Sequence, residues 1–290
     1  MLTPAQLAAR RVAAIADLEA QLAGHVEAAQ RLLLDGLLAR LSDIHADPGL
    51  LPALLQEYSA TVLAPLAAFY GQSLLGLPAL NVSYFQALDV AGYQQLRAPL
   101  ADFLAARLGI DAAGTLVPGG YLSSIAADTT VARSVLTYAY SAQASGMGIN
   151  AYREGLQTLV TGTDAVAKGV VQQLYASAGE DYAEADRTLH LVAARKLGLT
   201  AYLYQGGLIN SSRPFCVARN GKVFTEAEIA RFGTKDDHYG GYSDKAEGMF
   251  SGKTEPYDPL INAGGWNCRH FFHAIPASLA VAMRPDLAHV

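Results

Sequence analysis

Cysteine and histidine side chains gather near the end of the sequence, in the segment GGWNCRHFFH at residues 264–273. Cys216 precedes this segment in SRPFC, and His238 lies between the two. Thiolate sulfurs and imidazole nitrogens are the ligands that zinc prefers in tetrahedral sites. The candidate zinc ligands are therefore Cys216, His238, Cys268 and His270.

The spacing of these residues differs from that of common zinc motifs. Two cysteines separated by two to four residues, or two histidines separated by three to five, are usual in such motifs. Neither spacing occurs here; the nearest is His270-x2-His273, which is one residue too short. Strand alternation would place Cys268 and His270 on one face and His273 on the other. The competing interpretation makes Cys216 and Cys268 small buried hydrophobic residues on neighbouring strands, free or disulfide-bonded. We predict no resident cofactor and keep zinc as the alternative.

A nuclease is the enzymatic alternative. Asp236, Asp237 and His238 are adjacent and could hold a divalent cation that activates water. They stand in a glycine-rich stretch, however, where such residues usually form solvated surface. The phosphate-loop, zinc-protease and serine-hydrolase motifs do not occur in the chain. We expect a protein that is not an enzyme.

Two arginines stand in apolar and aromatic surroundings, Arg213 in SRPFC and Arg269 in WNCRH. The planar guanidinium suits a phosphate or a partner's carboxylate. The simpler prediction is that both arginines bind local carbonyl or carboxylate groups and hold strands together. Trp266 is expected to fill the core of the same module, and Asn267 to satisfy loop carbonyls.

The elements that precede this segment are predicted to be helices. Thr3-Pro4 is a favourable helix start, and Gly198 a plausible C-cap. An apolar stripe with a period of three to four residues indicates a helix of roughly forty residues: Ile15, Leu18, Leu22, Val26, Ala29, Leu33, Leu37, Leu41 and Ile44. Further helices are predicted near 50–75, 83–108, 123–144, 149–159 and 163–197. Residues 1–198 therefore form the predicted helical region.

The pattern changes at residue 199. Residues 200–204 are β-prone, and Asn220-Gly221 predicts a two-residue hairpin between strands at 213–217 and 222–224. We therefore count Gly221 among the residues that define the module.

A short helix and a closing strand complete the predicted module. Thr225 and Glu228 form a capping box for the helix. After a polar loop at 233–265, residues 266–275 are predicted to form the closing strand. The fold class is α+β: a mainly helical region, then a small module at 199–290 with a short antiparallel sheet.

Composition narrows the class of protein. The chain has 290 residues, 51% of them hydrophobic and 16% charged, which is typical of a globular protein. Its net charge is −5, and residues 206–290 carry nine basic and nine acidic residues. This balance disfavours general nucleic-acid binding, which depends on neutralising phosphates. We expect neither a membrane span nor a signal peptide, and synthesis in the cytoplasm.

Several motifs follow one another in a distinctive order: YLYQGG at 202–207, NSSRPFC at 210–216, NGKVF at 220–224 and GGWNCRH at 264–270. This arrangement resembles the C-terminal domain of the phage Mu F-like head morphogenesis family, the minor head proteins of tailed bacteriophages. The resemblance covers roughly residues 185–275. Asn210 stands where the family usually has Asp, and His270 where many members have a second cysteine.

The resemblance implies a structural role. Such proteins enter the phage head in few copies, associate with the portal, and in some phages contact the packaged DNA. We therefore expect a minor head protein of the virion, with portal or capsid proteins as partners. The residues expected to define the module are Arg213, Cys216, Gly221, Trp266, Asn267, Cys268 and Arg269. A tail or shell-decorating protein and a metal-dependent nuclease or toxin-like effector are the alternatives.

Overall fold

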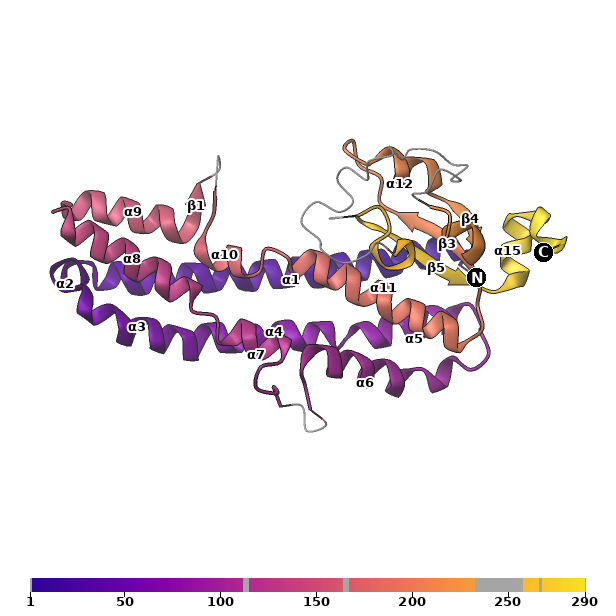
Figure 1. Ribbon diagram of the computed structural model, residues 1–290, viewed down its shortest axis with the longest axis horizontal. Helices are drawn as coiled ribbons and strands as arrows, with labels where there is room; N and C mark the ends of the chain where they lie inside the picture. The colour runs from indigo at the N-terminus through magenta and orange to yellow at the C-terminus, as the bar shows by residue number, and fades with distance from the viewer. Residues whose placement is uncertain (1, 112–114, 164–166, 233–257, 266–267, 290) are drawn as a thin grey trace. The chain divides into compact units, whose positions relative to one another are not determined.

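The computed structural model describes all residues except 1, 112–114, 164–166, 233–257, 266–267 and 290. The chain divides into two compact units (Figure 1). Unit 1 comprises Met1–Leu18, Leu74–Leu104 and Gly179–Val290, and unit 2 comprises Glu19–Ser73 and Ala105–Ala178. The boundary predicted between residues 198 and 199 marks a change in secondary structure, whereas each compact unit draws on segments that are distant in sequence.

Unit 2 is mostly α-helical. Helix α1 (Pro4–Ala39) supplies its first segment, and the apolar stripe of that helix is buried from Leu22 to Leu37 as its period predicts. The other helices that lie wholly or mainly in this unit are α2 (Leu41–Ala46), η1 (Pro48–Leu50), α3 (Leu51–Tyr58), the π-helical turn η2 (Ser59–Leu63), α4 (Ala64–Leu74), α7 (Tyr121–Ala126), α8 (Thr130–Ala144), α9 (Ile149–Thr161) and α10 (Val170–Leu174).

The single helix predicted over 163–197 is wrong in its first part. Strands β1 (Gly162–Thr163) and β2 (Ala167–Lys168) form a short antiparallel pair there. Gly162 has φ +76°, a left-handed conformation that ends α9 and suits glycine. Helix α10 follows, and α11 (Ala178–Lys196) then runs to Gly198, whose φ of +67° fits the predicted C-cap. Residues 164–166, within the predicted helix, lie outside the described residues.

Unit 1 combines helices with a sheet. Thr3 Oγ1 accepts a hydrogen bond from the Gln6 amide at 3.2 Å, which caps α1 as predicted. The other elements are α5 (Leu77–Ala87), η3 (Tyr93–Gln95), α6 (Arg97–Leu108), α11, β3 (Ala201–Gly206), α12 (Pro214–Arg219), β4 (Lys222–Thr225), α13 (Glu226–Ile229), α14 (Pro259–Asn262), β5 (His270–Ile275), α15 (Ala277–Met283) and η4 (Pro285–His289).

The helix predicted over 83–108 is divided between α5 and α6. Asp89 and Gly92 have φ values of +53° and +86°, which an α-helix cannot contain. The chain therefore leaves the helical path after Ala87 and resumes it at Arg97.

The sheet is antiparallel, with strand order β4-β3-β5 (Figure 1). In its register Leu203 pairs with Val223 on one side and with His273 on the other. The predicted strands at 200–204 and 222–224 are confirmed, as is the α+β class with a short antiparallel sheet. The described part of the closing strand begins at His270 rather than at residue 266.

The two faces of the sheet have different surroundings. On one face Ala201, Leu203, Val223 and Ile275 pack with Ala8 and with Ala280 of α15 in an aliphatic core. The other face is aromatic, built from Tyr202, Tyr204, Phe215, Phe224, Phe232 and Phe272. Alternation along β5 therefore directs His270 and His273 to opposite faces, as predicted.

The Asn220-Gly221 hairpin prediction is wrong. Residues 214–219 form helix α12 instead of a strand, and Pro214 supplies the favoured first helical position. Gly221 does have a left-handed φ of +77°, and its amide donates a hydrogen bond to the Tyr204 carbonyl at 2.8 Å. This glycine leads from α12 into β4, which pairs with β3 rather than with residues 213–217.

One continuous helical stretch, Pro48–Ala87, is long and apolar enough to cross a membrane by length and composition alone. The core helix of a soluble protein passes the same test, so this single stretch is weak evidence. The expectation that the chain has no membrane span stays a prediction.

Candidate functional site

Cys216, Cys268 and His270 lie together inside unit 1. Their ligand atoms are all within 4.8 Å of one another. The two sulfurs are 3.6 Å apart, and the Cys268 sulfur is 3.9 Å from His270 Nδ1. All three side chains are buried, with at most 4% of any one exposed. Three of the four candidate zinc ligands named from the sequence are thus brought together, and His238 lies outside the described residues.

Three separate elements position these side chains. Cys216 lies on α12, Cys268 lies in the turn that leads to β5, and His270 is the first residue of that strand. The prediction that the cysteines occupy neighbouring strands is wrong, because Cys216 is helical. The cluster instead connects a helix to the start of the strand, across residues that are distant in sequence.

Gly264 leaves room for the two sulfurs. Its amide donates a hydrogen bond to Cys268 Sγ at 3.1 Å. A Cβ atom at this position would stand 2.5 Å from Cys216 Sγ and 2.9 Å from Cys268 Sγ, closer than atoms can pack. The first of the paired glycines in GGWNCRH is therefore needed where the backbone approaches the thiols.

The electrostatic surroundings distinguish the two thiols. The hydrogen bond between the sulfurs, together with burial, raises the pKa of Cys216. The same hydrogen bond lowers the pKa of Cys268, helped by His270 and by the charge of Arg187. The two thiols are therefore coupled through one short contact, and the surroundings of Cys268 favour its ionisation over that of Cys216. The Tyr204 hydroxyl lies 3.4 Å from Cys216 Sγ and 3.8 Å from Cys268 Sγ.

Arg187 on α11 holds the backbone around the cluster. Its guanidinium donates hydrogen bonds to the carbonyl groups of Cys268, His270 and Ile261. It also lies 3.6 Å from Glu180 and 4.9 Å from the centre of the Phe271 ring. The sequence predicted such a role, with carbonyl or carboxylate groups, for Arg213 and Arg269, whereas no local pattern marked Arg187.

The other residues predicted to define the module lie in different surroundings. Arg213 is the half-buried N-cap residue of α12. Arg269 is exposed, whereas its neighbours Cys268 and His270 are buried. It therefore does not hold strands together from a buried position, as the sequence had predicted. Trp266 and Asn267, and the Asp236, Asp237 and His238 group proposed for a nuclease, lie outside the described residues.

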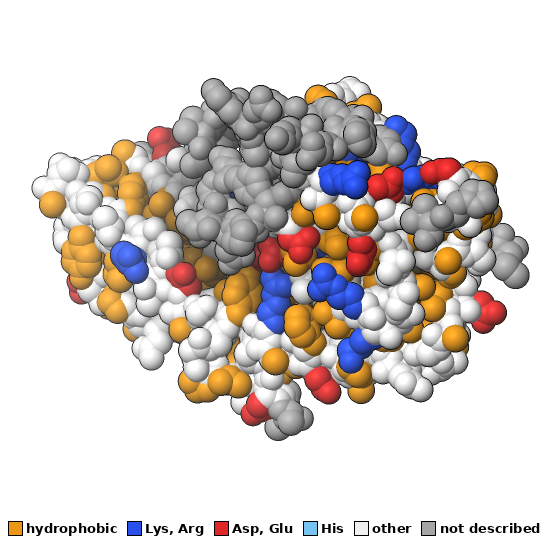
Figure 2. Space-filling view, turned by 45° about the vertical axis from the view of Figure 1, so that its right-hand side comes forward, with side chains coloured by type: hydrophobic (Ala, Val, Ile, Leu, Met, Phe, Trp, Pro, Cys, Tyr) orange, Lys and Arg blue, Asp and Glu red, His pale blue; other side chains and the backbone are white. Residues whose placement is uncertain are grey.

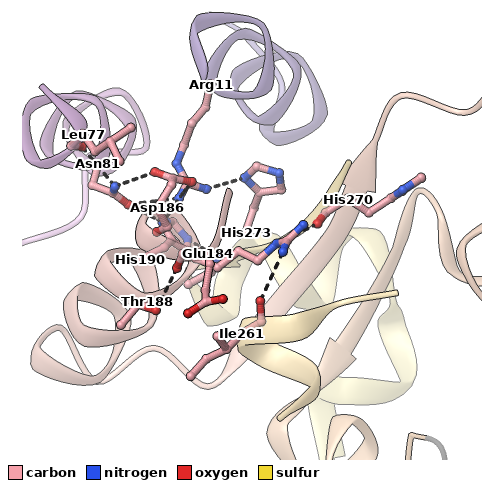
Figure 3. Close-up of polar contacts among 12 residues, drawn as sticks. Arg11, Leu77, Asn81, Glu184, Asp186, Thr188, His190, Ile261, His270 and His273 are labelled. Carbon is pink, nitrogen blue, oxygen red and sulfur yellow. Dashed lines mark hydrogen bonds and ion pairs between the residues drawn. The ribbon is translucent and has the colours of Figure 1, made fainter. Parts of the chain in front are cut away.

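A second buried cluster, which the sequence analysis did not identify, lies on the opposite face of the sheet (Figure 3). Arg11 Nη2 donates to Asp186 Oδ2 at 2.5 Å and to Asn81 Oδ1 at 3.1 Å, and Arg11 Nη1 donates to His273 Nδ1 at 3.0 Å. Asn81 Nδ2 in turn donates to Asp186 Oδ1 at 2.9 Å. The cluster joins α1, α5, α11 and β5 within unit 1.

His190 completes this network in its neutral form. Its Nδ1–H donates to Asn81 Oδ1 at 2.8 Å, and its Nε2 accepts the Ala274 amide hydrogen at 2.8 Å. A proton on Nε2 would face that N–H, so the arrangement requires neutral imidazole. Burial, and then the charge of Arg11, place the pKa values of His190 and His273 well below their ordinary range.

No family model, curated protein or solved structure matches this chain.

One sequence signal could have revealed the buried network. Arg11 precedes Ile15 by four residues, so it continues the apolar stripe of α1 toward the N-terminus. A charged residue on a buried helix face requires a partner. The identity of the partner could not be read in the same way, since Asp186 follows Arg11 by 175 positions.

The two clusters differ in what they can do chemically. The Arg11 network pairs its opposite charges internally and links most of its polar atoms, which is typical of a structural tie; Arg11 Nε and His273 Nε2 have no hydrogen-bond partner among the described residues. The cysteine–histidine cluster offers soft ligands to a metal ion. Since its side chains are buried, a metal there would be out of reach of a substrate and would stabilise the fold.

Proposed function

We propose that the chain is a structural component of a bacteriophage head, a minor head protein that associates with portal or capsid proteins in the virion. One observation carries the proposal. The motifs that resemble the Mu F-like family, separate in sequence, contribute β3, α12, β4 and β5 of one folded unit. Motifs that belong to one folded unit support a common origin with the family better than motifs that lie in unrelated parts of a structure.

The burial of the cysteine–histidine cluster favours a role without catalysis. A catalytic zinc site keeps a coordination position open to substrate. Cys216, Cys268 and His270 are at most 4% exposed, and Gly264 closes against the sulfurs. This geometry supports a structural site and weighs against catalysis by these three residues.

The surface is suited to protein partners more than to DNA. On the face that Figure 2 shows, acidic and basic side chains are interspersed among hydrophobic ones. The net charge of −5 likewise gives no general attraction for phosphates. Contact with packaged DNA is therefore a minor part of the proposal. It would follow from the position of the protein inside the head and not from an attraction to phosphates. In unit 1 the exposed apolar side chains Leu208, Ile209 and Val217 are available to a protein partner.

The apolar stripe of α1 is a weak candidate for partner binding. Its side chains from Ile15 to Leu37 are buried, apart from the half-buried Leu18, so they already pack within the chain. Leu32, 56% exposed, lies off that stripe. The partner surface is thus expected outside the stripe.

Quantitative mass spectrometry of virions from the phage or prophage that encodes the chain tests the proposal. We expect a few copies per particle, retained in purified heads and cross-linked to portal subunits. Hundreds of copies would identify a tail or decoration protein instead. Absence from virions, together with cation-dependent cleavage of DNA or RNA by the purified chain, would establish the nuclease alternative.

A further inference from the structure

We propose that Cys216 Sγ, Cys268 Sγ and a ring nitrogen of His270 bind one zinc ion that fastens helix α12 to the start of strand β5. The inference concerns how the module is held together and is independent of the proposed role in a phage head. It begins from three buried ligand atoms within 4.8 Å of one another.

The distances match the geometry of a tetrahedral zinc site. Zinc–sulfur bonds of about 2.3 Å and zinc–nitrogen bonds of about 2.0 Å place two sulfurs about 3.8 Å apart, and a sulfur and a nitrogen about 3.6 Å apart. The corresponding distances are 3.6 Å between the sulfurs and 3.9 Å from Cys268 Sγ to His270 Nδ1. These two distances are within a few tenths of an ångström of those that a bound zinc ion requires, and the third pair of ligand atoms lies within 4.8 Å.

A disulfide accounts for less of the arrangement. It would require an S–S bond of about 2.0 Å, whereas the sulfurs are 3.6 Å apart and both cysteines are free. It would also leave His270 without a role. His270 is 2% exposed, and its Nδ1 lies 3.9 Å from Cys268 Sγ, which a shared metal ion explains and a disulfide does not.

The surroundings are those of a metal site with outer-shell support. The Gly264 amide donates to Cys268 Sγ at 3.1 Å, and Arg187 donates to the carbonyl groups of the two ligands that flank the turn, Cys268 and His270. Such contacts fix ligand orientation and favour thiolate over thiol. Zinc binding would release the thiol protons to solvent, leaving two thiolates and a neutral imidazole on the ion.

Three protein ligands leave one tetrahedral position. The Tyr204 hydroxyl, 3.4 Å and 3.8 Å from the two sulfurs, or a water molecule can fill it. Because the described ligands are buried, the ion would be structural. It would add stability to a sheet module whose core is small.

The test uses the full chain, purified under reducing conditions and supplied with Zn²⁺ or Co²⁺ alone. We expect one zinc ion per chain by elemental analysis, and a thiolate-to-cobalt charge-transfer band with the visible bands of tetrahedral Co²⁺. Cys216→Ser, Cys268→Ser and His270→Gln should each weaken zinc affinity more than about 100-fold. His25→Gln, which removes an exposed histidine of unit 2, is the matched control and should leave affinity unchanged.

Measurements on the unaltered chain keep the test decisive if a variant fails to fold. Removal of zinc with a chelator should lower the denaturation midpoint of unit 1, and added Zn²⁺ should protect both thiols from a thiol reagent. Less than stoichiometric zinc in the folded, reduced chain would overturn the proposal. So would zinc binding that survives both cysteine substitutions. None of these results depends on whether the chain occurs in virions.

Discussion

Arg11 and Asp186 form an ion pair with 2.5 Å between Nη2 and Oδ2, and their side chains are only 2% and 0% exposed. Burial raises the pKa of the Asp186 carboxyl, while the Arg11 charge and the Asn81 amide oppose that rise. Removing two charges from water costs several kcal/mol for each ion, which only good geometry and additional hydrogen bonds repay. Asn81 forms hydrogen bonds with both ions and His273 accepts one from Arg11, while His190 donates to Asn81. The pair therefore fixes how α1 and α11 meet within unit 1.

Arg11→Met is expected to destabilise unit 1 by about 3–5 kcal/mol, because Asp186 would remain buried without a countercharge. Denaturant unfolding, followed by hydrogen exchange of amides in β3 and β5, measures this loss. Arg10→Met is the matched control: Arg10 is the neighbouring residue of the same type and is exposed. That substitution should change the free energy of unfolding by less than about 0.5 kcal/mol. Equal effects of the two substitutions would contradict the buried ion pair.

The pH dependence of stability follows from His190 and His273. Their pKa values are well below 6.5 in the folded chain, because burial and the Arg11 charge disfavour the imidazolium. As pH falls through about 6.5, the unfolded chain takes up protons that the folded chain does not. The free energy of unfolding should then decrease by up to about 1.4 kcal/mol per pH unit for each histidine.

His190→Gln isolates the contribution of one histidine. It should lower stability near neutral pH, since the bonds to Asn81 and Ala274 change, but it should also reduce the slope below pH 6.5 by up to about 1.4 kcal/mol per unit. Asp186 titrates in both proteins, so the difference between their slopes reports on the histidine. His25→Gln, at an exposed position, should leave the slope of unit 1 unaltered. An unchanged slope in His190→Gln would mean that His190 is charged in the folded state.

The sequence predicted local structure better than it predicted which residues meet. The stripe of α1, the capping box at Thr225 and the alternation of His270 and His273 depend on residues close in sequence, and each is found in the structure. The Asn220-Gly221 signal failed because Pro214 begins a helix there and β4 pairs with the earlier strand β3.

The two buried clusters also show that local sequence patterns do not predict contacts between residues far apart in the chain. Cys216 and Cys268 were recognised as candidates, but their meeting depends on the path of α12 and on Gly264. Arg187 and Asp186 looked like ordinary residues of a charged helix. The packing of α11 against α1, α5 and β5 removes them from water, and that packing is not encoded in any local pattern.

Gly264→Ala should disrupt the cysteine–histidine cluster without changing any ligand. The added Cβ would meet Cys216 Sγ at 2.5 Å and Cys268 Sγ at 2.9 Å, so at least one sulfur must move. Overpacking of this kind costs about 1–3 kcal/mol, measurable by denaturant unfolding. Gly207→Ala is the control, because Gly207 is exposed and a Cβ there has open space. Comparable losses in the two variants would show that the backbone, and not contact with the sulfurs, requires glycine at position 264.

Thr225→Ala should remove one half of the capping box between β4 and α13. Thr225 Oγ1 accepts the Glu228 amide hydrogen at 3.3 Å, and Glu228 Oε2 accepts the Thr225 amide hydrogen at 2.8 Å. Loss of the hydroxyl leaves a helix N–H without its partner and should cost about 1 kcal/mol in the free energy of unfolding. Thr225→Ser keeps the oxygen and should recover most of that loss. If serine proved as destabilising as alanine, the methyl group of Thr225 on β4, and not its hydroxyl, would be the stabilising part.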